Sequence, residues 1–274
     1  MNDIASGLVA AAGAVTRPID RDALFGVIKD IAKARGSGLT QAEVDRINGV
    51  LDGALAGESP PRFGAVPRPG GLRIGKVLEH VVGRAEDANI RAVADAITEH
   101  APRYGQDATP ERMAEFIAQI ANETGGFAHF SENLNYSAKR LTEVWPGRYP
   151  TLAAAQPYAR NPEALATHTY GGRMGNTQAG DGWRFRGRGA LQLTGRANYE
   201  RFGQLLGLDL VGNPDLAADP AVSVLIALEF FKQGRVNVAI DRGDFRQARK
   251  ITNGGYIGVE EVARLRAKAL QVLR

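Results

Sequence analysis

The sequence predicts a mainly α-helical protein with at most a small β element. In several segments, apolar residues recur at the spacing of one buried helix face, as do Met113, Phe116 and Ile120. Residues that cap helices precede these stripes, for example Thr109. The alternation typical of a strand occupies one short stretch, residues 183–194.

The chain divides into three parts. Residues 1–56 predict a small helical hairpin, in which the capping box Thr40-Gln-Ala-Glu43 begins a helix. Residues 57–72 contain four prolines and several glycines, a composition typical of a linker. The main domain, residues 73–274, has helical patterns at 73–82, 86–100, 110–123, 137–144, 151–157, 198–206, 222–233, 244–251 and 259–272.

The composition limits the chemistry that is available. Hydrophobic residues make up 44% of the chain, enough for a large core, and the absence of cysteine excludes disulfides and thiolate metal sites. The four histidines have no metal-binding spacing, so we expect neither a metal nor a cofactor. The net charge of +4 favours an anionic partner, such as an anionic cell wall or nucleic acid.

The N-terminus does not resemble a secretory signal. It has no basic n-region, and Asp3 has the wrong charge for one. No apolar run reaches the ~18 residues that span a bilayer. We therefore expect the protein to be made in the cytoplasm without an export signal of its own.

Two glutamates, nine positions apart, are the candidate catalytic groups. Glu123 continues the apolar stripe of its helix just before Gly125 and Gly126 end that helix. Burial disfavours the charged form of a carboxyl and raises its pKa, which suits a proton donor. Glu132 lies in a polar segment, where we expect a charged carboxylate. Two carboxyls in contrasting environments are typical of an acid and base pair that cleaves glycosidic bonds.

The segments after these glutamates are irregular and polar. Residues 133–182 are rich in loops, and long irregular segments in a compact domain are usually functional. In residues 183–194, the alternation predicts that Arg184, Arg186 and Arg188 share one side.

Several motifs occur in the order found in glycoside hydrolase family 19, and the sequence resembles that family over residues 74–274. The resemblance is closest to bacteriophage endolysins and bacterial lysozyme-like members, and implies a lysozyme-like helical catalytic domain. The motifs are Asn122-Glu-Thr-Gly-Gly126, Glu132-Asn-Leu-Asn-Tyr136, Tyr170-Gly-Gly-Arg-Met-Gly-Asn176, Gly182-Trp-Arg-Phe-Arg-Gly-Arg-Gly189, Leu191-Gln-Leu-Thr-Gly195 and Ile251-Thr-Asn-Gly-Gly255.

The resemblance implies an inverting mechanism on β-1,4-linked amino sugars. Glu123 matches the general acid, Glu132 the general base, and Thr194 the hydroxyl that helps to hold the attacking water. The remaining matches are sugar-binding positions and a basic residue that supports the acid; they are Gln192, Asn198 and Asn253 for the sugars, and Arg266 for the acid. Tyr136 is one of four aromatic candidates for packing on a sugar ring, with Tyr170, Trp183 and Phe185, and each is equally suited to the core.

The sequence departs from the plant chitinases of that family. Asn122 replaces a histidine before the acid, no disulfides are possible, and the two glutamates are closer in sequence. These departures favour peptidoglycan, and hence a muramidase-type endolysin that cleaves between N-acetylmuramic acid and N-acetylglucosamine. Such an enzyme acts from the host bacterial cytoplasm on the periplasmic wall, with a membrane-permeabilising holin as partner. We expect a monomer that does not bind nucleic acid.

Two alternatives remain open for the function and two for the hairpin. A chitinase of the same fold is the first rival. A non-catalytic protein that binds cell wall or nucleic acid is the second, and the three arginines at 184, 186 and 188 motivate it. The hairpin of residues 1–56 suits either wall targeting or a helical cap on the main domain.

Overall fold

The computed structural model describes residues 74–274. The hairpin predicted for residues 1–56 and the linker predicted for 57–72 lie outside the described residues, so both stay predictions. The described helices are α4 (Ile74–Val82), α5 (Ala88–His100), η1 (Ala101–Tyr104), α6 (Pro110–Glu123), α7 (Ala138–Val144), α8 (Leu152–Ala155), η2 (Gln156–Tyr158), α9 (Pro162–Tyr170), α10 (Asp181–Arg184), α11 (Arg196–Leu206), η3 (Pro214–Ala218), α12 (Pro220–Gln233), α13 (Val236–Asp241), α14 (Phe245–Asn253) and α15 (Val259–Leu273).

The mainly helical fold is confirmed. Within residues 74–274 the only β structure is a pair of isolated antiparallel bridges, from Arg188 to Ser131 and from Arg188 to Leu193. None of the described helices is long and apolar enough to cross a membrane.

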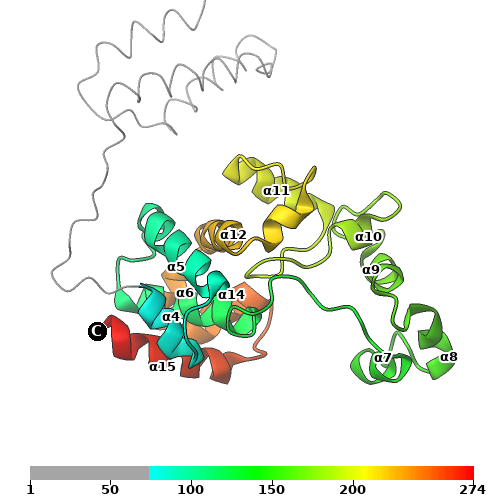
Figure 1. Ribbon diagram of the computed structural model, residues 1–274, viewed down its shortest axis with the longest axis horizontal. Helices are drawn as coiled ribbons and strands as arrows, with labels where there is room; N and C mark the ends of the chain where they lie inside the picture. The colour runs from blue at the N-terminus through cyan, green and yellow to red at the C-terminus, as the bar shows by residue number, and fades with distance from the viewer. Residues whose placement is uncertain (1–73) are drawn as a thin grey trace, which may run out of the picture. The chain divides into compact units, whose positions relative to one another are not determined.

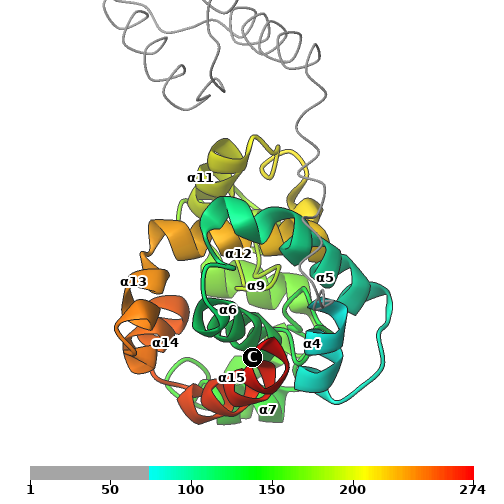
Figure 2. The ribbon, with the colours of Figure 1, turned by 90° about the vertical axis from the view of Figure 1, so that its left-hand side faces the viewer.

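Helix α6 lies at the centre of the main core. Figure 2 shows α4, α5, α12, α14 and α15 around it. Phe116, Ile117 and Ile120 are fully buried, and the burial of each such side chain contributes about 1.5–3 kcal/mol. The rings of Phe116 and Phe231 meet edge to face at 5.0 Å, which packs α6 against α12. This packing fixes the C-terminal end of α6, where Glu123 lies.

The start and the end of α6 follow from local sequence. The Thr109 hydroxyl accepts a hydrogen bond from the Arg112 backbone N–H, and Pro110 takes the first helical position. After the helix, the Thr124 hydroxyl donates to the Ile120 carbonyl and accepts from the Phe127 backbone N–H. The turn closed in this way presents Glu123 at the last residue of the helix.

A second group of helices, α7 to α10, lies to one side of the domain. Figure 1 shows this group away from α4, α6 and α15. Its core is aromatic and aliphatic, with Tyr149, Leu141 and Leu165 fully buried or nearly so. Between the two groups of helices, Arg188 pairs with Ser131, which follows Phe130, and with Leu193, which lies shortly before α11.

The strand expected over residues 183–194 is wrong, because this segment holds the end of α10, a turn, and the isolated bridge residues Arg188 and Leu193. Trp183 and Arg184 belong to the short helix α10, which begins after Gly180 in the left-handed region, φ 81°. The three arginines do not share one side, because each has a different environment. Arg184 donates to the Val211 carbonyl, Arg186 stacks on Trp183, and Arg188 is buried and ion-paired with Asp215.

Candidate active site

Glu123 is held at the end of α6 by a buried arginine. Oε1 of its carboxylate accepts hydrogen bonds from Arg249 Nη1 at 2.7 Å and from Asn122 Nδ2 at 3.2 Å. Oε2 receives no hydrogen bond from the residues that the structure describes, and the side chain is 20% exposed. The carboxyl is largely buried, but the group that it contacts is the guanidinium of Arg249 and not only apolar side chains.

Arg249 is the centre of a buried polar network. It is 2% exposed, and it also donates to the Gln119 side-chain oxygen and to the Ile257 carbonyl, each at 2.7 Å. The Gln119 amide in turn donates to Glu115, which is fully buried. Burial raises the pKa of the Glu115 carboxyl, and its hydrogen bonds from Arg266 and Gln119 act in the opposite direction.

Arg266 occupies a different place from the one predicted. Its guanidinium donates to Glu115 at 3.0 Å and lies 3.5 Å over the ring of Phe245. Its connection to Glu123 is therefore indirect, through Glu115, Gln119 and Arg249. The basic residue that contacts Glu123 is Arg249, which sequence reasoning missed.

Glu132 is anchored by backbone and by a phenol. Its backbone N–H donates to the Gly187 carbonyl at 3.0 Å, and its Oε1 accepts from the Gly187 N–H at 2.5 Å. Its Oε2 accepts from the Tyr170 hydroxyl at 2.7 Å. Burial raises the pKa of Tyr170, and the neighbouring Glu132 carboxylate raises it further, so this hydroxyl stays a donor.

Gln192, Thr194 and Asn198 form one turn beside Glu132. The Thr194 hydroxyl donates to the Gln192 carbonyl and the Asn198 amide donates to the Thr194 carbonyl, both at 2.8 Å. A Cβ added to Gly187 would lie 2.8 Å from Gln192 Oε1 and 3.2 Å from Glu132 Oε1, so these two side chains meet at this glycine. Gln192 has a φ of 53°, an uncommon conformation for a residue other than glycine.

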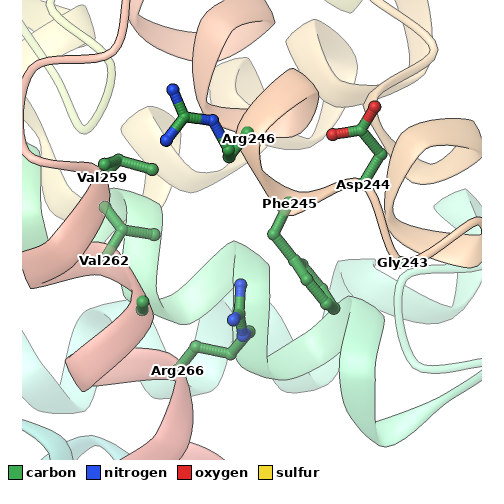
Figure 3. A pocket seen from close by; sticks show the side chains of 8 residues that line it. Gly243, Asp244, Phe245, Arg246, Val259, Val262 and Arg266 are labelled. Carbon is green, nitrogen blue, oxygen red and sulfur yellow. The ribbon is translucent and has the colours of Figure 1, made fainter.

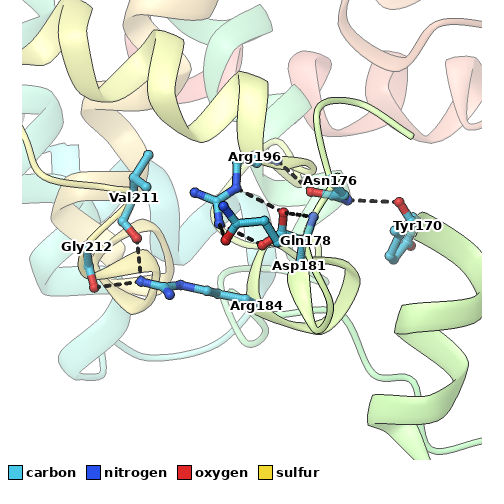
Figure 4. A network of polar contacts seen from close by, with 8 residues as sticks. All are labelled: Tyr170, Asn176, Gln178, Asp181, Arg184, Arg196, Val211 and Gly212. Carbon is cyan, nitrogen blue, oxygen red and sulfur yellow. Dashed lines mark hydrogen bonds and ion pairs between the residues drawn. The ribbon is translucent and has the colours of Figure 1, made fainter. Parts of the chain in front are cut away.

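A polar network connects the Tyr170 end of α9 to this turn (Figure 4). The Asn176 amide donates to the Tyr170 carbonyl, and its oxygen accepts from the Arg196 backbone N–H. The Arg196 side chain donates to both carboxylate oxygens of Asp181 at 2.7 and 3.0 Å. Because Arg196 begins α11 two residues after Thr194, the network fixes Thr194 relative to Tyr170 and hence to Glu132.

The two other predicted sugar-binding residues, Tyr136 and Asn253, make no hydrogen bond to either glutamate. Tyr136 is half-buried and meets Trp145 edge to face at 5.4 Å, within the aromatic core of α7 to α9. Asn253 is the last residue of α14, four positions after Arg249, and is half-buried.

A cavity of about 320 Å³ lies between the start of α14 and α15 (Figure 3). Arg246, Phe245 and Arg266 line it, and neither glutamate does. Among residues 74–274, no group of three or more histidine, aspartate or glutamate side chains is placed to hold a metal ion.

The family model described as "Chitinase class I", glycoside hydrolase family 19, matches residues 85–239, more than half of the chain. A glycosyl hydrolase family 19 domain-containing protein of Haemophilus influenzae is 36% identical over 159 residues, which are 56% of this chain and 76% of that protein. The chain belongs to glycoside hydrolase family 19. It is therefore a glycoside hydrolase, as the resemblance implied.

Other members of the family match shorter stretches or only the fold. An acidic 27 kDa endochitinase of Solanum lycopersicum is 50% identical over 66 residues, 24% of this chain and 26% of that enzyme. The crystal structure of chitinase C from Streptomyces griseus covers 74% of this chain and 77% of its own, with a TM-score of 0.52 at 20% identity. That likeness shows that the lysozyme-like helical fold is shared.

The matched region holds most of the predicted site. Glu123, Glu132 and Thr194 lie inside residues 85–239, whereas Arg249, Asn253 and Arg266 lie beyond them. The arginine that contacts Glu123 therefore comes from a part of the chain that the family model does not match.

Proposed function

We propose that this family 19 hydrolase is a peptidoglycan-cleaving lysozyme of the endolysin type. It would hydrolyse the β-1,4 bond between N-acetylmuramic acid and N-acetylglucosamine with inversion. The observation that carries the proposal is the contrast between the two carboxyls. Glu123 has one oxygen fixed by Arg249 and one free of hydrogen bonds from the described residues, whereas both oxygens of Glu132 are held.

This contrast suits an acid and a base. The free oxygen of Glu123 would donate its proton to the glycosidic oxygen as the bond to the anomeric carbon breaks. Glu132 would take a proton from a water whose oxygen bonds to the anomeric carbon from the opposite face, which inverts the configuration. Thr194 donates its own hydroxyl proton to Gln192, so the lone pairs of its oxygen remain to accept from that water.

Three features of the chain support peptidoglycan as the substrate. They are the net positive charge, Asn122 before the proposed acid, and the absence of cysteine. A cell wall is anionic, so a basic protein concentrates near it. Acting as an endolysin, the enzyme would work as a monomer, reach the wall from the host cytoplasm after a holin permeabilises the membrane, and require no cofactor.

A chitinase is the second candidate. The names of the relatives favour it, because the tomato protein is an endochitinase and the Streptomyces griseus structure is a chitinase. Gln192 and Asn198 suit the recognition of acetamido and hydroxyl groups, which chitin and peptidoglycan share.

The test of catalysis is the clearing of Gram-negative cells whose outer membrane has been permeabilised. We expect clearing by the full chain, and loss of at least about 10³-fold for Glu123→Gln, because the variant has no proton to donate. Glu143→Gln is the matched control, since Glu143 is an exposed glutamate of α7. Circular dichroism checks that all three proteins are folded. Full lytic activity of Glu123→Gln refutes the assigned role.

The test of substrate compares purified sacculi with soluble chitin oligomers at equal enzyme concentration. Mass spectrometry of the wall products identifies the cleaved bond, because a muramidase leaves N-acetylmuramic acid at the new reducing end. Efficient cleavage of the chitin oligomers with intact sacculi supports the chitinase instead.

A further inference from the structure

The outer face of α14 carries two cations around an exposed aromatic ring. Arg246 and Lys250 are exposed and lie one helical turn apart. The Arg246 guanidinium lies 4.9 Å from the centre of the Tyr256 ring, and the Lys250 ammonium lies 5.8 Å from it. Tyr256 is 46% exposed and Ile257 is 82% exposed. We call these four residues the α14 patch.

No ion pair within the described residues balances these two charges. Neither Arg246 nor Lys250 forms an ion pair with any residue from 74 to 274. Asp244, at the N-cap, accepts from the Gln247 backbone N–H. Like charges at i and i+4 destabilise a helix by about 0.2–0.5 kcal/mol. An anionic partner would relieve that repulsion.

The patch is joined to the proposed acid by one side chain. Arg249 lies on the buried side of the same helix, where it donates to Glu123 and to the Ile257 carbonyl. A ligand on Tyr256 and Ile257 would therefore contact the loop that Arg249 holds. Arg246 also lines the cavity of about 320 Å³ beside the patch (Figure 3), which is at the lower end of the range for ligand pockets.

We propose that the α14 patch binds a peptidoglycan strand outside the catalytic centre. The Tyr256 ring packs on a sugar, and the cations of Arg246 and Lys250 pair with carboxylates of the stem peptides. The inference rests on the proposed function, because it takes peptidoglycan as the substrate. Chitin is neutral and offers the cations no partner, so the patch favours the wall polymer by charge complementarity.

The experiment measures co-sedimentation with purified sacculi at low ionic strength. All proteins carry Glu123→Gln, so that the wall is not digested during the assay. We expect Arg246→Gln/Lys250→Gln to bind about 5–20-fold more weakly, from the loss of two charge pairs near a surface. The matched control is Lys139→Gln/Arg201→Gln, which removes two exposed cations elsewhere, one of them also beside a ring.

A second substrate identifies the anionic group. The parent protein should bind amidated sacculi, whose carboxylates are neutral, as weakly as the patch variant binds native sacculi. The patch variant should bind native and amidated sacculi equally. Equal binding by the patch variant and its parent overturns the proposal, as does an equal loss in the control. If a DNA oligonucleotide displaces the parent protein equally from native and amidated sacculi, the proposal is also overturned, and the patch is a phosphate-binding site.

Failure of the patch and failure of the catalytic assignment give different results. A protein that clears cells but whose patch variant binds normally leaves the proposed function intact and refutes the patch. A protein whose Glu123→Gln variant still clears cells loses the proposed acid, and binding by the patch variant and its parent is then compared at 4 °C over a time too short for the wall to be digested.

Discussion

The Arg249 guanidinium serves three acceptors at once: Glu123, Gln119 and the Ile257 carbonyl. A planar guanidinium holds its five donors in fixed directions, whereas the ammonium of a lysine is a single point with three donors and would not reach the same acceptors in this arrangement. Because Gln119 is fully buried, its side-chain oxygen has no water to replace a lost donor. Arg249 therefore both stabilises the core and orients the carboxyl that we propose as the acid.

We predict that Arg249→Met lowers kcat about 10–100-fold with little change in KM. Glu123 would lose the contact that fixes Oε1, and a misplaced catalytic group lowers the rate of the reaction. The free energy of unfolding should fall by about 2–4 kcal/mol, from the orphaned buried acceptors. Steady-state kinetics and urea unfolding measure the two effects, with Arg264→Met, an exposed arginine of α15, as control. A stability loss with unchanged kcat would mean that Arg249 is purely structural.

Tyr170 is the corresponding positioning residue for Glu132. We predict that Tyr170→Phe lowers kcat about 10-fold, because it removes the donor to Glu132 Oε2 and little else. The raised pKa of this phenol has a second consequence. The Tyr170 hydroxyl stays protonated near pH 10, the ordinary pKa of a tyrosine. Wild-type activity should therefore not fall at that pH through ionisation of Tyr170.

The measurement is a pH profile of kcat for both proteins. Tyr158→Phe is the control, since Tyr158 contacts His168 in the aromatic core rather than a glutamate. Equal activity of Tyr170→Phe and wild type at every pH would show that the Gly187 N–H alone positions Glu132.

At the scale of elements, the bridged segment around Gly187 brings Glu132 and Gln192 together. We predict that Gly187→Ala lowers kcat/KM about 10²-fold while the fold survives. The added methyl would lie 2.8 Å from Gln192 Oε1 and 3.2 Å from Glu132 Oε1, and both are ends of flexible side chains that must move. The unfolding free energy should change by about 1 kcal/mol or less, as for substitutions without a core defect.

The matched control is Gly147→Ala, where an added Cβ meets nothing within 4 Å. Hydrolysis rates and thermal melting of both variants separate the two cases. If Gly187→Ala is as active as the control, Gln192 and Glu132 do not need their present positions.

Local signals made α6 predictable. The cap, the first proline and the apolar stripe of this helix all lie within fifteen residues, and each indicates the same helix. The structure confirms that the helix ends at Glu123. The alternation at residues 183–194 predicted a strand wrongly because the contacts that decide the structure are distant. Arg184 bonds to Val211 and Gly212, and Arg188 pairs with Asp215.

The same reason limits what sequence says about the site. The turn of Gln192, Thr194 and Asn198 is local, so its motif is visible in the sequence. Arg249 contacts a carboxyl that lies 126 residues earlier, and nothing in its own helix indicates that partner. The one available signal was a charged residue next to Ala248 on the apolar side of α14, and both prove to be buried.

At the scale of the whole molecule, ion pairs and caps hold separate elements together. Arg112 joins α6 to α13 through Asp241, Arg196 joins α11 to α10 through Asp181, and Asp87 caps α5. The pKa of each aspartate is lowered. For Asp241 and Asp181 the main cause is the arginine hydrogen bond, and for Asp87 it is the Ile90 backbone N–H.

These shifts predict how stability depends on pH. An aspartate with a lowered folded pKa contributes stability that is complete above its ordinary value of 3.8 and is lost as pH falls through the lowered value. Glu115 has the opposite sign, since its raised pKa costs stability where it is charged and favours the fold where it is protonated. The free energy of unfolding should therefore decrease below about pH 4, where the carboxyls with a lowered pKa become protonated: these three aspartates, with Glu111 and Glu261.

Urea unfolding at pH 3, 4, 5 and 7 measures this dependence. Asp181→Asn should have a shallower decrease below pH 4, because it removes the most deeply buried of the three carboxylates, 2% exposed. Asp95→Asn, an exposed aspartate of α5, should keep the wild-type slope. If Asp181→Asn and wild type lose stability in parallel, the Arg196 contact does not contribute to acid unfolding, and the fixing of α10 to α11 must come from apolar packing instead.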